Sequence, residues 1–183
     1  LQASHKATVT YVNSVVATST TKLTTERSMV EDTPILDFIG KVEADTVAKA
    51  IKGGKYDGIP VIAQVSPFSR TAAFPKGDVK IKDIAGLYVF DNTLAGLLLT
   101  GKQLKDYLEY SAKYFKQVKK GAIVTPAPAS EGGDTQADYQ GKPVWDYNYD
   151  AVTGVKYSID VSKPVGKRIL GLSWQSKPVT DDQ

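Results

Sequence analysis

The residues best suited to ligand chemistry lie in a loop, residues 66–77, which follows a short apolar run at 59–63. The apolar run is rich in branched residues and predicts a buried strand. A loop at the end of a buried strand is a common position for a binding site. The Arg70 guanidinium can donate paired hydrogen bonds to phosphate or ribose oxygens. We therefore take Ser66, Phe68 and Arg70 as candidate binding residues.

Residues 96–102, with the sequence GLLLTGK, imitate a phosphate-binding loop. The next residue is Gln103, where that motif requires a serine or threonine hydroxyl for magnesium. Three leucines also fill the part of the loop that would cradle phosphate. We interpret the segment as a buried strand that runs into a helix, because Thr100 and Gln103 have the spacing of a capping box.

The chain has one histidine, His5, and no cysteine. A dinuclear metal centre that hydrolyses phosphoesters needs several imidazoles besides carboxylates. We therefore expect no metal site in this chain, and no hydrolysis by the chain alone. The lack of cysteine excludes disulfides and a cysteine nucleophile, and it is also common in exported proteins of organisms that do not rely on disulfides.

The segment 87–115 is the most informative part of the sequence. An apolar run at 87–90 meets Asp91-Asn92, a pair that favours a turn, and a second apolar run follows at 94–100. Apolar residues at helical spacing then predict a helix from Gly101. The predicted order is strand, turn, strand and helix.

This segment resembles the C-terminal nucleotide-binding domain of the 5'-nucleotidase family, and most closely the bifunctional 2',3'-cyclic-nucleotide 2'-phosphodiesterases/3'-nucleotidases. Further segments that resemble successive parts of that domain, in the same order, are HKATVTYVNSVVATST (5–20), IPVIAQVSPF (59–68), PKGDVKIKDIAGLY (75–88), WDYNYDAVTGVKYSIDV (145–161) and GLSWQSKPV (171–179). The resemblance covers most of the chain.

The resemblance implies that Phe90 stacks on a nucleobase, although its position alone would favour a core aromatic. Asn92 could hydrogen-bond a base edge, or it could be present because asparagine tolerates left-handed turn geometry. Arg70 lies in the loop where the family carries a substrate-contacting arginine, although SPFSR (66–70) replaces the family's usual Asn- and Gly-rich form. The family's second stacking aromatic would lie beyond Gln183.

The predicted fold class is α+β, a layered domain with mixed or antiparallel sheets and two main helices. The first helix is expected at about 34–52, with Pro34 at its first position, and the second at about 101–116. Strict alternation predicts a strand at 155–161 that forms a hairpin with 145–149, and a last strand follows at 168–174. Residues 119–143 are rich in Pro, Ala, Gly and acidic residues, and we expect an exposed loop there, an excursion from the folded core.

The length of 183 residues fits a single domain, 1–183, with an N-terminal linker over about 1–20 that leads into an extended segment. The resemblance implies that the C-terminus of this domain is truncated. The 23 basic and 20 acidic residues are mixed along the chain, so nothing calls for a nucleic-acid polymer as a partner. No run approaches the roughly 20 apolar residues of a membrane span.

The resemblance implies a substrate-binding and specificity domain of a secreted two-domain nucleotide phosphohydrolase. Its partners would be a nucleotide or nucleoside and an N-terminal metallophosphatase domain of the same polypeptide, which would carry two divalent metal ions. The location would be extracellular, cell-wall associated or periplasmic. A stand-alone, non-catalytic nucleotide-binding or cell-surface module of the same fold is the alternative. The preference among 2',3'-cyclic, 3'- and 5'-nucleotides stays open.

Overall fold

A computed structural model describes residues 2–66, 69–88, 90, 92–122 and 148–182. Its helices are α1 (Gln2–Val12), α2 (Pro34–Ile51), α3 (Ile81–Leu87) and α4 (Gly101–Ala112). Its strands are β1 (Val15–Ser19), β2 (Leu23–Thr24), β3 (Ala63–Val65), β4 (Ala73–Phe74), β5 (Gly77–Lys80), β6 (Ala151–Thr153), β7 (Lys156–Ile159), β8 (Ile169–Trp174) and β9 (Lys177–Pro178). The α+β fold class is confirmed.

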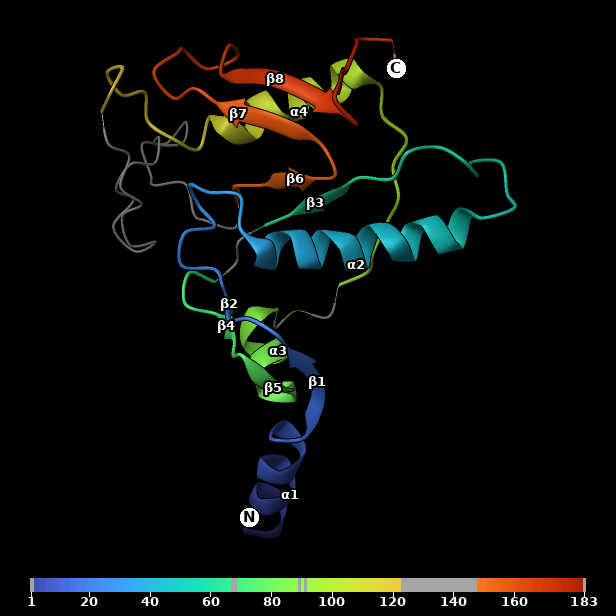
Figure 1. Cartoon of the computed structure of the whole chain (residues 1–183), viewed down its shortest axis with the longest axis vertical. Coiled ribbons are helices and arrows are strands. Elements are labelled where there is room, and N and C mark those ends of the chain that lie inside the picture. Colours follow the sequence, from blue (N-terminus) through green and yellow to red (C-terminus); the bar gives the residue numbers. More distant parts are fainter. Residues whose placement is uncertain (1, 67–68, 89, 91, 123–147, 183) are drawn as a thin grey trace.

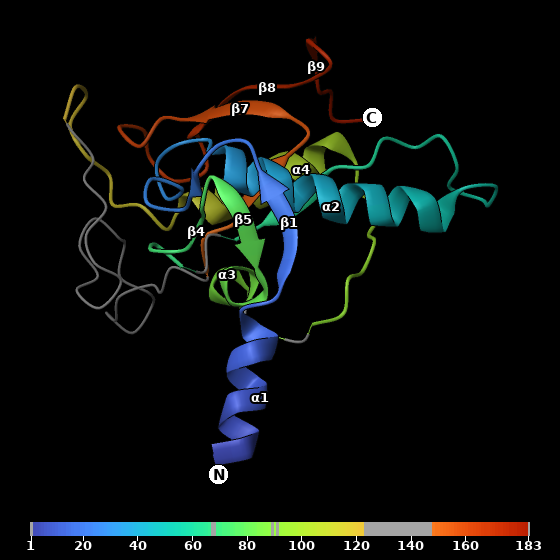
Figure 2. The same ribbon diagram turned by 60° about the horizontal axis from the view of Figure 1, so that its bottom comes forward.

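The strands form small antiparallel sheets. Three are pairs, β1 with β5, β2 with β4 and β3 with β6, and the fourth sheet has the order β7-β8-β9. Figure 1 shows these sheets in layers, with β7, β8 and α4 at one end, α2 and the β3–β6 pair in the middle, and α3 with β1 and β5 below. Helix α1 extends away from the rest of the chain, and the rotated view in Figure 2 shows the same arrangement.

Helix α2 is the central element that connects these layers. Thr33 precedes it in an extended conformation and Pro34 stands in its first turn, as the sequence predicts. Gly40 lies so close to β6 that an added Cβ would be 1.9 Å from Thr153 Oγ1. Only glycine therefore lets α2 approach β6 this closely, and α2 lies directly against the β3–β6 pair.

Helix α4 begins with the predicted capping box. The Gln103 amide donates to Thr100 Oγ1 at 3.2 Å, and the Thr100 amide donates to Gln103 Oε1 at 2.8 Å. Its apolar face contributes to a buried cluster with β6 and β8, made of Leu104, Leu108, Ala112, Val152 and Ile169. The helix ends at Ala112, four residues before the predicted end.

A buried arginine joins the end of α4 to the start of β8. Arg168 is 0% exposed, and its Nη1 donates to Ala112 O and Phe115 O at 2.7 Å each. In return, the Glu109 carboxylate accepts the backbone amides of Arg168 at 2.9 Å and Ile169 at 2.8 Å. These contacts satisfy carbonyls that a helix end leaves without intrahelical partners.

The buried strand that we expected at 94–100 is wrong. No strand is assigned there, and Leu97 and Leu98 are 83% and 66% exposed. The run is apolar enough for burial, but burial requires a neighbouring strand, and none of the described strands pairs with it. The other half of that prediction, the helix cap at Thr100, is confirmed.

Two helices replace predicted extended segments. Residues 2–12 form α1 instead of a linker, and the extended conformation begins only with β1. Residues 81–87 form α3, which includes Leu87 of the strand predicted at 87–90; residues 88 and 90 are in no strand, and residue 89 lies outside the described residues. In α3, the Asp83 carboxylate accepts the Lys80 amide at 2.8 Å, which caps the first turn. The apolar residues of both segments suit either a strand or a helix. In α3, the capping hydrogen bond from Lys80 to Asp83 favours the helix.

The C-terminal strands follow the prediction in part. Strand β7 forms where alternation indicated it, but it pairs with β8, whereas most of the expected partner at 145–149 lies outside the described residues. Most of the predicted excursion at 119–143 also lies outside them. The predicted strand at 59–63 begins later, as β3. Among the described helices, none is both long enough and apolar enough to cross a bilayer.

Candidate functional site

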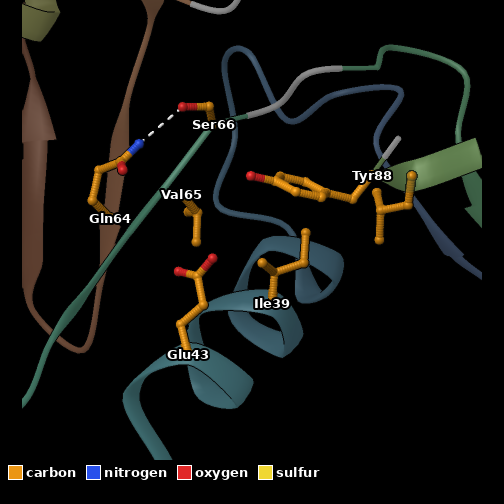
Figure 3. A pocket seen from close by; sticks show the side chains of 7 residues that line it. Ile39, Glu43, Gln64, Val65, Ser66 and Tyr88 are labelled. Atoms are coloured by element: carbon orange, nitrogen blue, oxygen red, sulfur yellow. Dashed lines mark hydrogen bonds between the residues drawn. The ribbon is translucent and has the colours of Figure 1, made fainter. Parts of the chain in front are cut away.

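A pocket of about 60 Å³ lies where α2, β3 and the segment after α3 meet. Its lining residues are Ile39, Glu43, Gln64, Val65, Ser66, Leu87 and Tyr88. Figure 3 shows the Tyr88 ring above Ile39, while the Glu43 carboxylate points toward Val65. The volume is well below the roughly 150 Å³ of a cavity that holds benzene. In this form the pocket accepts one edge or substituent of a ligand, and not a whole nucleobase.

Ser66 lines this pocket and is hydrogen-bonded to the carboxylate of Asp150. Its hydroxyl hydrogen-bonds Asp150 Oδ1, and it accepts from Gln64 Nε2 at 2.9 Å. Gln64 Nε2 also donates to Asp150 Oδ1 at 2.8 Å. Ser66 is buried, so these bonds fix its orientation at the end of β3. The predicted site residue therefore belongs to the pocket.

Asp150 is further connected to α4. Its Oδ2 accepts from Tyr107 OH at 2.5 Å, and its backbone amide donates to Ser111 Oγ at 2.9 Å. Burial, reinforced by the hydrogen bond to Asp150, raises the pKa of Tyr107, so that its phenol keeps the proton it donates. The back of the pocket is thus a fixed hydrogen-bond network that includes two helical side chains.

Asn92 is linked to the pocket through Tyr88, whereas Phe90 follows Tyr88 by two residues and is not among the lining residues. Asn92 Nδ2 donates to Tyr88 OH at 2.8 Å, and Tyr88 is a lining residue. Phe90 is 58% exposed, which leaves part of its ring accessible, as a stacking role requires and a core role does not. The role of Phe90 in stacking stays a prediction, as does a contact of Asn92 with a base.

Arg70 lies beside a different cluster. Its Nη2 donates to Tyr114 OH at 3.4 Å. Tyr114 belongs to a buried group formed by Met29, Tyr114, Phe115 and Tyr149. The structure does not place Arg70 among the pocket-lining residues, and its contact with substrate stays a prediction. Phe68, the fifth candidate, lies outside the described residues.

Three polar residues of the pocket, Glu43, Gln64 and Tyr88, were not predicted from the sequence, and neither was the supporting Asp150. Gln64 is the middle residue of β3 and points away from its two buried neighbours, so strand alternation could have indicated it. Glu43 follows Ile39 by four residues on α2, and helical spacing could have placed both on one face. Asp150 is 84 residues from Ser66, and no local pattern connects the two.

Burial beside Ile39 and Val65 raises the pKa of Glu43 above its ordinary value of 4.5. Within the described parts of the chain, no group of three or more His, Cys, Asp or Glu side chains is arranged to hold a metal ion. The polar groups of the pocket are a carboxylate, an amide, a hydroxyl and a phenol. These groups can bind a polar ligand through hydrogen bonds.

A family model for the 5'-nucleotidase C-terminal domain matches residues 15–183. Among curated relatives, the chain is 29% identical over 203 residues to the trifunctional nucleotide phosphoesterase protein YfkN of Bacillus subtilis (strain 168), covering 100% of this chain and 13% of the relative. It is 27% identical to the 2',3'-cyclic-nucleotide 2'-phosphodiesterase/3'-nucleotidase of Haemophilus influenzae, with 96% of this chain and 28% of the relative covered.

Solved structures described as 5'-nucleotidases share the fold of this chain. A Staphylococcus aureus structure described as a putative 5'-nucleotidase in complex with alpha-ketoglutarate matches with a TM-score of 0.74 and 25% identity, over 100% of this chain and 32% of that one. A 5'-nucleotidase precursor from Thermus thermophilus has the same fold, with a TM-score of 0.65. The chain thus spans less than a third of the length of these relatives. With the family model matching nearly all of its residues, the chain belongs to the 5'-nucleotidase C-terminal domain family.

Proposed function

We propose that this chain is the nucleoside- or nucleotide-binding domain of a secreted two-domain, metal-dependent phosphohydrolase, either a 2',3'-cyclic-nucleotide 2'-phosphodiesterase/3'-nucleotidase or a 5'-nucleotidase. The observation that carries the proposal is the exposed Phe90, two residues after a tyrosine that lines the pocket. An exposed aromatic face next to fixed polar groups suits a ligand with a flat base and a polar sugar.

The proposal divides the work between two domains. The N-terminal domain would hold two divalent metal ions and carry out the phosphoester chemistry, since this chain has one histidine. This domain would hold the base and ribose. Substrate sites commonly form between domains, and a rotation of one domain against the other could bring a base-anchored nucleotide to the metals.

The side chains around the pocket would then have separate tasks. Phe90 would stack on the base, with Asn92 oriented by its hydrogen bond to Tyr88. Ser66, fixed by Asp150, would present a polar group at the pocket wall. Arg70 would approach phosphate or ribose oxygens from the neighbouring loop. No nucleic-acid polymer is required as a ligand.

Export is the second part of the proposal. A chain of 183 residues without cysteine is in keeping with an exported protein from an organism that does not rely on disulfides. The parent protein would then be extracellular, cell-wall associated or periplasmic. Cell fractionation followed by immunoblotting tests this, and recovery of the parent protein only from the cytoplasm would contradict it.

The Phe90→Ala substitution in the full-length parent protein tests the binding role. Loss of the stacking surface should weaken nucleotide binding by about 1–3 kcal/mol, which raises KM roughly 5- to 150-fold where KM reports binding. Hydrolysis of bis-nitrophenyl phosphate, which has no base, should stay near the wild-type rate. The melting temperature should change little, because the ring is mostly exposed.

Tyr110→Ala is a matched control, since Tyr110 is an aromatic residue of α4 that is 63% exposed and lies outside the pocket. It should leave both substrates unaffected. An equal loss on nucleotide and base-free substrate after Phe90→Ala, together with a lower melting temperature, would mean that Phe90 is a structural residue. A parent protein that binds nucleotides but hydrolyses none would favour the non-catalytic module.

A further inference from the structure

Glu43 is the charged side chain of the pocket. It extends from α2 one turn after Ile39, and Figure 3 shows its carboxylate pointing into the space beside Val65. The Tyr88 phenol oxygen points toward the same space from the opposite wall. The carboxylate therefore faces the pocket, and not the solvent side of the helix.

The Glu43 carboxylate has no hydrogen-bond or ion-pair partner among the described residues. The nearby acidic residue of the same helix, Asp45, is by contrast exposed and paired with Lys41 at 2.9 Å. A half-buried carboxylate without a protein partner loses part of its hydration, and the Glu43 oxygens keep some contact with solvent, since no described side-chain oxygen is both buried and without a partner. The raised pKa of Glu43 has this same cause, burial of the charged form.

A ligand could supply the missing partner. An ionised carboxylate only accepts hydrogen bonds, so a fitting ligand must present an N–H or O–H donor. The neighbouring Gln64 donates through Nε2 to Ser66 and Asp150, and its amide oxygen is a neutral acceptor, so an ionised Glu43 carboxylate is the stronger acceptor of the two. Its negative charge also repels phosphate, which favours the uncharged part of a nucleotide at this position.

The sequence separation between Tyr88 and Phe90 limits how far the stacking position can lie from the Tyr88 wall of the pocket. Tyr88 and Phe90 are two residues apart, so their Cα atoms are separated by at most about 7 Å. A base stacked on Phe90 would carry its sugar and its exocyclic groups within a similar distance. One nucleoside could thus contact Phe90 and place a small donor group in the pocket of about 60 Å³.

We propose that Glu43 is a specificity-determining residue that accepts a hydrogen bond from an O–H or N–H donor of the bound nucleoside, either a ribose hydroxyl or an exocyclic amino group. This inference rests on the proposed function, since it requires that the domain binds nucleosides. It assigns the pocket to the sugar or base edge and leaves the phosphate outside it.

The test is an NMR titration of the 183-residue chain with adenosine, for which we expect a millimolar Kd. Glu43→Met keeps the length of the side chain and removes the acceptor, and it should weaken binding about three- to tenfold. Glu43→Gln should cause a smaller loss, because a neutral amide oxygen still accepts but more weakly than a carboxylate. Asp45→Asn removes a charge from the same helix outside the pocket and should leave Kd unchanged.

Three analogues distinguish the source of the donor. Purine riboside lacks the exocyclic amino group, whereas 2'-deoxyadenosine and 3'-deoxyadenosine each lack one ribose hydroxyl. If Glu43 accepts from the amino group, Glu43→Met should bind purine riboside as well as the wild type does. If it accepts from a ribose hydroxyl, the difference between the two proteins should vanish for one of the deoxy analogues.

Three further outcomes show whether this inference fails alone or together with the proposed function. Weaker adenosine binding by Phe90→Ala, with wild-type Kd for both Glu43 variants, would overturn the role of Glu43 and leave the binding function intact. An equal loss in Glu43→Met and Asp45→Asn would also overturn it, as a general charge effect. If the wild-type chain shows no shifts with adenosine at millimolar concentration, the proposed function and this inference both fail.

Discussion

At the scale of single residues, Glu43 has opposite effects on folding and on binding. Its raised pKa means that the folded chain binds more protons at this site than the unfolded chain does at pH values just above 4.5. The stability contributed by the protonated form is present at low pH and is lost as pH rises through the folded pKa. A neutral residue at this position avoids that loss.

We therefore predict that Glu43→Gln raises the melting temperature at pH 7, where wild-type Glu43 is charged, and has a smaller effect at pH 4. Thermal unfolding followed by circular dichroism at a series of pH values would measure this. Asp37, on the same helix, also has a pKa raised by burial, so the comparison must be between the variant and wild type at each pH. A lower melting temperature at pH 7 would show that the Glu43 carboxylate is stabilised by a contact absent from the structure.

Single residues also show how far the sequence can identify the site. Ser66 could be predicted because it stands at a local transition from an apolar run to a polar loop. Phe90 and Asn92 came from a family resemblance, since position alone would favour a core aromatic at residue 90. Helical spacing could have placed Glu43 on the same face as Ile39, but its position in the pocket, like the role of Asp150, depends on contacts between segments that are far apart in the chain.

At the scale of elements, the junction between α4 and β8 depends on Arg168. We predict that Arg168→Ala lowers the free energy of unfolding by about 2–4 kcal/mol, because several buried carbonyls, including Ala112 O and Phe115 O, lose their donor. Urea denaturation at neutral pH measures this change. Arg27→Ala provides the comparison, since the Arg27–Glu31 pair is exposed and its loss should change stability far less than the loss of Arg168. Similar values for the two variants would contradict the prediction.

Elements with strong local signals were predicted correctly, and elements that depend on distant partners were not. Pro34 and the Thr100–Gln103 capping box each fix a helix start through contacts within one turn. The leucine run at 94–100 has the composition of a buried strand, but the described strands give it no neighbour. In α1, the valines favour a strand, yet the segment is a helix, within which the Thr8 hydroxyl donates to the carbonyl four residues earlier.

At the scale of the whole molecule, the chain spans less than a third of the length of the relatives it matches. We predict that the isolated chain releases no phosphate from a 3'-nucleotide in the presence of manganese, because one histidine cannot build a dinuclear site of the usual type. A phosphate-release assay with repurified protein measures this. Activity that survives repurification and scales with the concentration of the chain would contradict the prediction.

Helix α1 has 11 residues and buries none of them. An isolated helix shorter than about 12–15 residues is marginally stable in water, so little besides its own hydrogen bonds keeps α1 formed. Its backbone amides should therefore exchange with deuterium within seconds to minutes, whereas amides at the centre of α4, beside Leu108, should exchange only on opening of the core. Hydrogen exchange followed by mass spectrometry would show this contrast, and equal protection of the two helices would mean that α1 docks against another surface.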